Sequence, residues 1–334
     1  MKILLAAAVL LVAATGWCAP YEVAAWTFGD APSLNAAANR AAIDEVNVDW
    51  YFSRPDLSIH ADGVLPAFVS LARARGIRVL ATVSNWTETL GDFDPELAHK
   101  ILANSGARDK HTNAIVQLCL DNGYDGIDLD WEALHPGDRA RFTTFVTMLA
   151  SKLHNKGKWL SIAVHAKESE PGNWEGPKAQ DWKKLGAVVD EFKIMTYDYS
   201  GPWSEPGPIS PPSWTDAVLA HAETLVPPSK IMMGVPFYGY NWDADSCVDV
   251  DWKSARALAK AHHSAIKRDA SAEAVFRYTD NAGAAHTVYF QDRPALAAKL
   301  RMLLQNHPDI RGIAIWRMGG ETPAFWDEIV LKLR

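Results

Sequence analysis

The 334-residue sequence has few cysteines and no excess of positive charge. Its three cysteines exclude a fold that depends on a framework of disulfides. Cys119 lies in an apolar helical stretch and is expected in the core. For Cys247, the sequence does not indicate whether the thiol forms a disulfide. The formal net charge of −7 argues against a nucleic-acid backbone as partner. Glycine-rich phosphate loops, Cys/His metal spacings and the G-x-S-x-G motif of serine hydrolases are also absent.

Long hydrophobic runs are absent except at the N-terminus. There, Lys2 precedes an apolar run from Ile3 to Ala14, and small residues follow. This pattern predicts a secretory signal peptide over residues 1–19 and a catalytic domain over 20–334. An uncleaved anchor is the alternative, but the run is short for a membrane span. We therefore expect a secreted or periplasmic monomer with no stable membrane insertion.

What the sequence does contain is a regular alternation of strand-like and helix-like segments. Eight strands separated by helices in about 310 residues favour an α/β fold, a (β/α)₈ TIM barrel, over a doubly wound sheet. A small α+β insertion is predicted between the seventh and eighth strands, over residues 243–291. The predicted strands are Glu22–Phe28, Val46–Phe52, Ile77–Ser84, Tyr124–Glu132, Trp159–His165, Phe192–Tyr197, Ile231–Phe237 and Arg311–Trp316.

Most connecting segments have helical periodicity. Ser33 is the expected N-cap of the first helix, and the long fourth segment is expected to break near Ser105-Gly106. The predicted helices are Ser33–Ile43, Val64–Arg75, Pro95–Asp121, Asp138–Asn155, Asp181–Val189, Thr215–Val226, Ser254–Lys267 within the insertion, and Pro323–Leu333.

The fourth strand ends in a row of acids. Side chains two apart share one face of a strand, so Asp128, Asp130 and Glu132 form one row. The opposite row, Ile127–Leu129–Trp131, is apolar. Carboxylates that share a site raise one another's pKa, so the row is costly unless a reaction uses a protonated acid beside ionised ones. A hard-cation site is the alternative on chemistry alone.

The segment Asp125-Gly-Ile-Asp-Leu-Asp-Trp-Glu132 resembles the DGxDxDxE signature of glycoside hydrolase family 18, the chitinases and their relatives. Three further segments resemble motifs of that family, in the family's order. They are Met195-Thr-Tyr-Asp198 on the sixth strand, Gly234-Val-Pro-Phe-Tyr-Gly239 on the seventh, and Gly312-Ile-Ala-Ile-Trp316 on the eighth.

The third strand departs from the common chitinase pattern. It ends in Thr82-Val-Ser-Asn-Trp86, without the glycine pair of S-x-G-G. That departure, with Ala166-Lys167 and the proline-rich loop over residues 201–211, is similar to the branch that includes spore-cortex-lytic N-acetylglucosaminidases, which act on peptidoglycan. The resemblance therefore leaves chitin, peptidoglycan and other N-acetylated glycans open as substrates, and endo- and exo-action as well.

The resemblance implies a retaining mechanism in which the substrate's own 2-acetamido oxygen attacks the anomeric carbon. Glu132 would be the general acid, its pKa raised in part by Asp130. Asp130 would hold the acetamido N–H, with Asp128 behind it. Tyr197 would donate to the acetamido oxygen and Asp198 would hold the distorted sugar. Substrate-binding positions would be Trp316 as the floor, Met195, Tyr238, Trp86 and Trp26; no metal or cofactor is implied.

The barrel rule places active-site groups at the carboxyl ends of the strands. His165 faces either the cleft or the core, and His262-His263 are expected on the surface. Two other functions are alternatives: a glycan-binding lectin on the same barrel, and a metal-dependent hydrolase that uses the acid row as ligands. The strand-end groups are Trp26, Tyr51, Trp86, Asp130, Glu132, Tyr197, Asp198, Tyr238 and Trp316.

Overall fold

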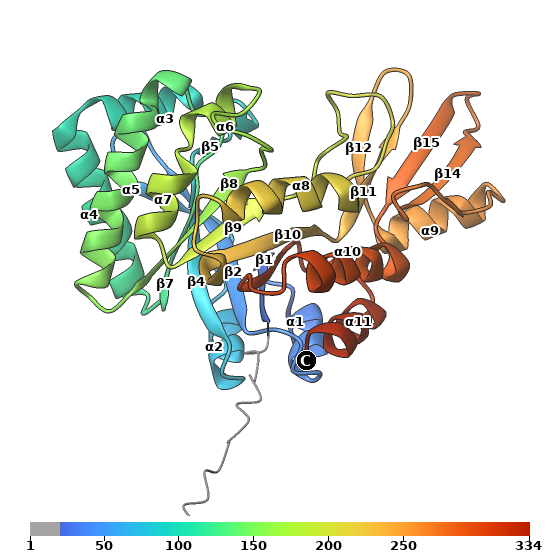
Figure 1. Ribbon diagram of the computed structural model, residues 1–334, viewed down its shortest axis with the longest axis horizontal. Helices are drawn as coiled ribbons and strands as arrows, with labels where there is room; N and C mark the ends of the chain where they lie inside the picture. Colours follow the sequence, from blue (N-terminus) through green and yellow to red (C-terminus); the bar gives the residue numbers. More distant parts are fainter. Residues whose placement is uncertain (1–20) are drawn as a thin grey trace, which may run out of the picture.

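Eight parallel strands close into a barrel (Figure 1). The computed structural model describes residues 21–334, so the predicted signal peptide lies outside the described residues. The strand order is β1-β16-β10-β9-β8-β7-β4-β2, and pairing between β1 and β2 closes the barrel. The TIM-barrel prediction is confirmed, because a doubly wound sheet has open edges. The barrel strands are β1 (Glu22–Thr27), β2 (Glu45–Ser53), β4 (Arg78–Ser84), β7 (Gly126–Asp130), β8 (Trp159–His165), β9 (Glu191–Met195), β10 (Ile231–Pro236) and β16 (Gly312–Trp316).

Helices surround the barrel, and many begin at a side-chain cap. Asp94 caps the third helix and Asn104 the fourth, which places the break in the long helical segment where the sequence predicts it. Within the described residues, no helix is both long and apolar enough to cross a membrane. The barrel helices are α1 (Ala31–Ala38), α2 (Pro66–Ala74), α3 (Pro95–Ala103), α4 (Ser105–Asp121), α5 (Arg139–His154), α6 (Glu175–Ala179), α7 (Trp182–Val188), α8 (Pro212–Glu223), α10 (Arg293–Asn306) and α11 (Pro323–Leu333).

Several helix predictions need correction. The helix of the insertion ends at Ala261 rather than Lys267, and the short α6 was not predicted. The first helix begins at Ala31 rather than after Ser33, because the Asp30 carboxylate accepts the Ser33 N–H and makes Asp30 the N-cap. The predictions omit α10, although its sequence carries the expected signals. Asp292 caps it at the Ala295 N–H, and Leu296, Leu300 and Leu303 repeat at helical spacing along its buried face.

The main core lies between the barrel and its helices. Ile127, Leu129 and Trp131 point outward into it and are fully buried, which confirms the predicted alternation along β7. The Trp131 ring stacks on Phe145 of α5 with centroids 4.7 Å apart. Cys119 of α4 is also buried in this layer, as predicted. Each large side chain buried here contributes about 1.5–3 kcal/mol.

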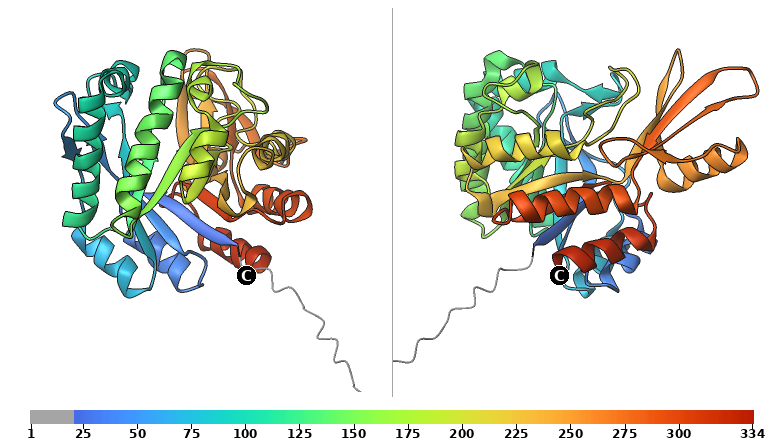
Figure 2. Two further views of the ribbon diagram at one scale, coloured as in Figure 1. Left: turned by 60° about the vertical axis from the view of Figure 1, so that its left-hand side comes forward. Right: turned by 45° about the vertical axis from the view of Figure 1, so that its right-hand side comes forward.

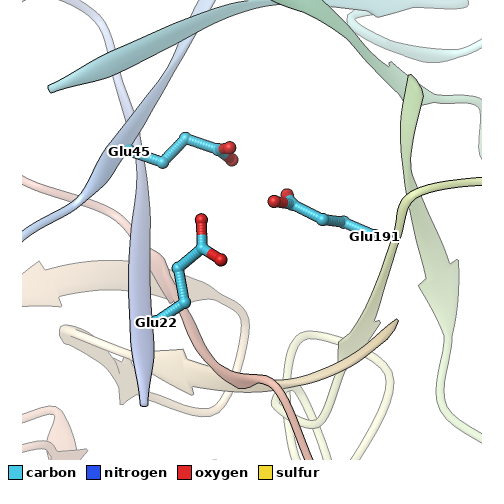
Figure 3. Close-up of side chains that lie close together, drawn as sticks. All are labelled: Glu22, Glu45 and Glu191. Atoms are coloured by element: carbon cyan, nitrogen blue, oxygen red, sulfur yellow. The ribbon is translucent and has the colours of Figure 1, made fainter. Parts of the chain in front are cut away.

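The bottom of the barrel holds a network of charges. Glu22, Glu45 and Glu191 begin their strands, and their carboxylates point toward one another (Figure 3). Arg78 pairs with all three, Arg311 with Glu22 and Glu191, and the buried Lys193 with Glu45 and Glu191. The carboxylates are thus neutralised by protein cations, so we interpret the cluster as structural rather than as a metal site.

A small α+β unit projects from the barrel between β10 and β16 (Figure 2). Its sheet has the order β12-β11-β15-β14-β13, and α9 packs on it. The predicted interval 243–291 misses its first strand, which follows β10 directly. His263 is exposed, whereas His262 stacks on Tyr278 with centroids 4.2 Å apart. The unit contains β11 (Tyr238–Trp242), β12 (Cys247–Asp251), α9 (Trp252–Ala261), β13 (Lys267–Arg268), β14 (Ala274–Thr279) and β15 (Ala285–Phe290).

Three short pairings complete the top and side of the barrel. β3 (Ile59–Ala61) pairs with the end of β2, and β5 (Trp86–Thr87) pairs with β6 (Asp92–Phe93). The β5–β6 hairpin lies just beyond the end of β4, so its side chains border the barrel mouth. Single turns of 3₁₀ helix are present at Pro136–Asp138 and Pro228–Lys230.

Candidate active site

A cavity of about 990 Å³ opens at the carboxyl ends of the barrel strands. It brings together nearly all the residues that the sequence singles out. Its wall is formed by Trp26, Phe28, Asp49, Phe52, Asp62, Ser84, Trp86, Asp92, Phe93, Asp130, Glu132, Ala133, Ala163, His165, Ala166, Trp174, Met195, Tyr197, Asp198, Trp203, Trp214 and Trp316. Asp128 lies beneath this wall and Tyr238 behind it.

Asp128 is fully buried and fully engaged. Its Oδ2 accepts hydrogen bonds from Trp26 Nε1 at 2.7 Å and Thr82 Oγ1 at 3.3 Å. Its Oδ1 accepts a hydrogen bond from Lys193 Nζ at 3.3 Å. Lys193 thereby joins the charge network at the barrel bottom to the base of the acid row. These contacts fix the Asp128 carboxyl below the cavity wall, where it is fully buried.

Asp130 is the middle carboxyl of the row and faces the cavity. Its Oδ1 is buried and has no hydrogen-bond partner among the described residues. Burial raises the pKa of this carboxyl well above its ordinary value, and the charges of Glu132, Asp49 and Asp128 add to the effect. A buried acceptor without a partner is costly, so this oxygen is prepared for a donor from outside the protein.

Glu132 lies two residues beyond the end of β7, and Asn85 fixes its backbone. The Glu132 N–H donates to Asn85 Oδ1 at 2.9 Å, and Asn85 Nδ2 donates to the Glu132 carbonyl at 2.9 Å. Asn85 is itself buried at the end of β4. Asn85 belongs to the strand end that lacks the family's glycine pair, and it has a direct part in holding the acid in place; this role was not predicted from the sequence.

The Glu132 carboxyl is 20% exposed, toward the cavity. Burial raises its pKa to about 8, and the charges of Asp198, Asp92 and Asp49 contribute. Its environment therefore keeps the carboxyl protonated at neutral pH. The sequence predicts that Asp130 contributes to this rise, whereas the structure attributes it to burial and to carboxylates after β9, on β6 and on β2; between the two acids, the charge of Glu132 raises the pKa of Asp130 instead.

Tyr197 and Asp198 follow the end of β9. The Tyr197 ring is buried, lines the cavity and meets Tyr238 edge-on with centroids 6.2 Å apart. Asp198 accepts hydrogen bonds from the hydroxyls of Tyr238 and Tyr240, the latter at 2.9 Å. Burial raises the pKa of Asp198. The insertion therefore acts on the site through β11, whose two tyrosines hold Asp198.

Aromatic side chains form two walls and a floor. Trp316 lies at the end of β16 and packs edge-on against Trp26 and Phe28, with centroids 6.0 and 6.2 Å apart. Trp86 packs on Phe52 at 5.6 Å. On the side of the β8 and β9 loops stand further rings that the sequence analysis did not select: Trp174, Trp203 and Trp214. Such flat faces can stack on sugar rings.

Two expected strand-end residues do not line the cavity: Tyr238, a predicted substrate-binding residue, instead bonds Asp198 from behind, and Tyr51 lies away from the site. Tyr51 is buried in the outer core, where its hydroxyl meets that of Tyr124 at 2.7 Å. The reason is a register shift in β2 between Asp49 and Tyr51, which reverses the alternation so that Phe52 reaches the cavity instead. Asp49 also lines the cavity, and burial raises its pKa to about 7, with the charge of Asp128 adding to the effect.

Comparison with known proteins agrees with this geometry. Glycosyl hydrolases family 18 matches residues 33–321. The uncharacterized glycosylase YvbX of Bacillus subtilis (strain 168) is 27% identical over 310 residues, 91% of this chain and 89% of that protein. The cortical fragment-lytic enzyme of the same organism is 30% identical over 243 residues, 70% of this chain and 56% of that protein.

Among solved structures, a chitinase from Chromobacterium violaceum ATCC 12472 matches with a TM-score of 0.85 and 28% identity, covering 94% of this chain and 100% of that one. The family match spans most of the barrel and includes the acid row, the Met195–Asp198 segment and Trp316. The chain belongs to family 18 of the glycosyl hydrolases and is a glycosidase.

Proposed function

We propose that the protein cleaves β-1,4 bonds of N-acetylglucosamine-containing glycans by a retaining, substrate-assisted mechanism. The observation that carries the proposal is the pairing of Glu132, a carboxyl with a pKa of about 8 on the cavity wall, with Asp130, whose buried Oδ1 lacks a partner. The first supports the role of general acid at neutral pH, because a general acid must be protonated. The second supports the binding of an acetamido N–H.

The first step needs two events. Glu132 transfers its proton to the glycosidic oxygen, and the acetamido oxygen of the same sugar attacks the anomeric carbon as the leaving bond breaks. Asp130 accepts the acetamido N–H and holds the group in position for attack. The Tyr197 hydroxyl donates to the acetamido oxygen, and Asp198, held by its two tyrosines, binds the distorted sugar. Trp316 supports the apolar face of that sugar.

The second step reverses the proton transfer. The Glu132 carboxylate takes a proton from water, and that water opens the cyclic intermediate at the anomeric carbon with net retention. Asp128 stays in place below Asp130, held by hydrogen bonds from Trp26, Thr82 and Lys193. Its charge adds to the burial that raises the pKa of Asp130.

The charge of the cavity supports uncharged N-acetylated glycans over those rich in carboxylates. Among the described residues that line it, six carry carboxyl groups and none is Lys or Arg. A muramyl lactate or a stem-peptide carboxylate would find no cationic partner among these lining residues, whereas N-acetylglucosamine oligomers need none. The six are Asp49, Asp62, Asp92, Asp130, Glu132 and Asp198.

One experiment tests both the reaction and the substrate. N-acetylchitohexaose and peptidoglycan are incubated separately with wild type, Glu132→Gln and the control Glu88→Gln, whose side chain is exposed on the β5–β6 hairpin. We expect cleavage of the oligosaccharide, at a rate reduced by about 10²–10⁴-fold in Glu132→Gln and unchanged in Glu88→Gln. Near-wild-type turnover by Glu132→Gln contradicts the assignment of the acid. Cleavage of peptidoglycan alone contradicts the substrate proposal, and binding without cleavage by all three proteins favours a lectin.

We also propose that the protein is exported, to the periplasm or the medium, because its substrate polymers lie outside the cytoplasm. Fractionation of cells that express the full chain tests this. Retention of the protein in the cytoplasm with residues 1–19 intact would contradict it.

A further inference from the structure

The mechanism above leaves one buried group on the cavity wall without a role. His165 is the last residue of β8, lines the cavity and is only 8% exposed. Its Nε2 lies 3.5 Å from Glu132 Oε2. The same Nε2 is buried and has no hydrogen-bond partner among the described residues. The separation is slightly longer than a hydrogen bond, and catalytic hydrogen bonds of free enzymes commonly shorten when substrate binds.

The surroundings of His165 hold its ring in one orientation. The Trp174 ring meets it edge-on with centroids 4.4 Å apart. Gly176 of α6 presses against the ring so closely that an added Cβ would lie 2.7 Å from His165 Cδ2. The His165 backbone N–H donates to Gln180 Oε1 at 2.9 Å. Because the ring is held in this way, its Nε2 already points at Glu132 before substrate binds.

The imidazole is neutral, because burial lowers the pKa of His165 to about 3. Its neighbour Lys167 on the following loop is already paired with Glu170 at 2.8 Å. Four carboxyls interact with Glu132: Asp49 on β2, Asp92 on β6, Asp198 after β9 and, on its own strand, Asp130. The Tyr197 hydroxyl also faces it, but that hydroxyl is assigned to the acetamido oxygen of the substrate. Carboxylate neighbours cannot donate a hydrogen bond to Glu132 when ionised, whereas the imidazole can.

We propose that His165 is a positioning residue for Glu132, acting through a hydrogen bond from its Nε2–H to Glu132 Oε2; this rests on the glycosidase function proposed above. With Oε2 occupied as an acceptor, the proton to be transferred resides on Oε1. That proton passes to the glycosidic oxygen, the bond to the anomeric carbon breaks, and Glu132 becomes a carboxylate. The bond from His165 strengthens as this charge forms, because charge-assisted hydrogen bonds are roughly twice as strong as neutral ones.

The test compares wild type with two variants on N-acetylchitohexaose. His165→Phe keeps a ring against Trp174 but removes the N–H, and His165→Gln returns an N–H donor at similar reach. We expect His165→Phe to lower kcat by about 10–100-fold with little change in KM, and His165→Gln to recover most of the loss. The loss of activity at high pH should move upward in His165→Phe, because the Glu132 carboxylate loses a donor that stabilises it.

The proposal is overturned if His165→Phe retains the wild-type kcat and pH profile, or if both variants lose activity equally through KM. A readout that needs no mutation is the ¹⁵N chemical shift of the His165 ring, which reports its tautomer. We expect the Nε2–H tautomer from pH 6 to 9, and the Nδ1–H tautomer would contradict the proposal. These outcomes are distinct from failure of the proposed function, which would show as a folded wild type that cleaves no N-acetylated glycan.

Discussion

Glu132 must carry a proton at the pH at which the protein works, and its surroundings favour that state. A buried carboxyl facing three other carboxyls cannot ionise as easily as one in water. In the free protein its pKa is raised to about 8. The same surroundings raise the pKa of Asp130. At neutral pH the site therefore binds more protons than the same carboxyls would bind in water.

A pH dependence follows from these shifts. The general acid is active when protonated, so kcat/KM should fall as pH rises through the pKa of Glu132 in the free protein, with a midpoint near 8. The measurement is kcat/KM for N-acetylchitohexaose from pH 4 to 10, with melting temperatures to confirm that the fold persists. A midpoint of the alkaline loss below pH 6 would show that the site does not raise the pKa of Glu132.

The sequence predicts the residues of the acid row better than their neighbours. The period of two along β7 places Asp128 and Asp130 inward, and the structure agrees. The same rule fails for Tyr51, because a bulge in β2 depends on pairing with β4 and leaves no mark in the local pattern. Asp49 was missed for the same reason. It lies beside Thr82 of β4, which lies beside Asp128 of β7, and this row across three strands forms only when the strands pair.

At the scale of elements, the end of β4 and the end of β7 depend on each other through Asn85. Its amide forms two partly buried hydrogen bonds with the Glu132 backbone at the barrel mouth. The chain that follows β7 bends at Ala133, which has a φ of 49°. A small side chain at position 85 would leave the Glu132 N–H and carbonyl without their partner.

Replacement of Asn85 by Ala should therefore affect both stability and activity. The change removes three hydrogen bonds, two to the Glu132 backbone and one from Asn85 Nδ2 to the Asp94 carbonyl. Their loss is expected to lower the free energy of unfolding by about 1–3 kcal/mol, because partly buried polar groups are left unsatisfied. The displaced acid should lower kcat by about 10-fold or more. Urea denaturation and steady-state kinetics measure the two effects, with Asn113→Ala on the exposed surface of α4 as control. An Asn85→Ala protein with wild-type kcat would show that Glu132 needs no such support.

Most elements could be predicted because barrel strands are short apolar runs bounded by turn residues. All eight strands lie within about two residues of the predicted ranges. Helix α10 was omitted although Asp292, Pro294 and its leucine repeat are readable signals. The first strand of the insertion, Tyr238–Trp242, was missed because it continues directly from β10 as one apolar, aromatic stretch. Its end is defined only by antiparallel pairing with β12 and β15.

At the scale of the whole molecule, Lys193 connects the two ends of the barrel interior. Its Nζ contacts Glu45 at 2.7 Å, Glu191 at 3.3 Å and Asp128 at 3.3 Å, and the side chain is fully buried. These charges raise the pKa of Lys193 above its usual value, against the effect of burial. Its ammonium is therefore the counter-ion both of the barrel bottom and of the acid row.

Removal of that charge should be costly. Lys193→Met leaves buried carboxylates without their partner, and breaking a buried pair in this way costs about 3–5 kcal/mol. Urea denaturation should show this loss, with Lys184→Met, on an exposed residue paired with Asp181, as control. Any folded Lys193→Met protein should also be less active, since Asp128 loses a partner. A change in the free energy of unfolding below about 1 kcal/mol would mean that the network is dispensable.

The account as a whole depends on the substrate's acetamido group acting as nucleophile within this barrel. The most direct measurement is time-resolved ¹H NMR of wild type with N-acetylchitohexaose, with cellohexaose, which lacks the acetamido groups, as the matched substrate. The account predicts that the β-anomer of the new reducing end appears first and that cellohexaose is not cleaved. Initial release of the α-anomer, or efficient cleavage of cellohexaose, would contradict it.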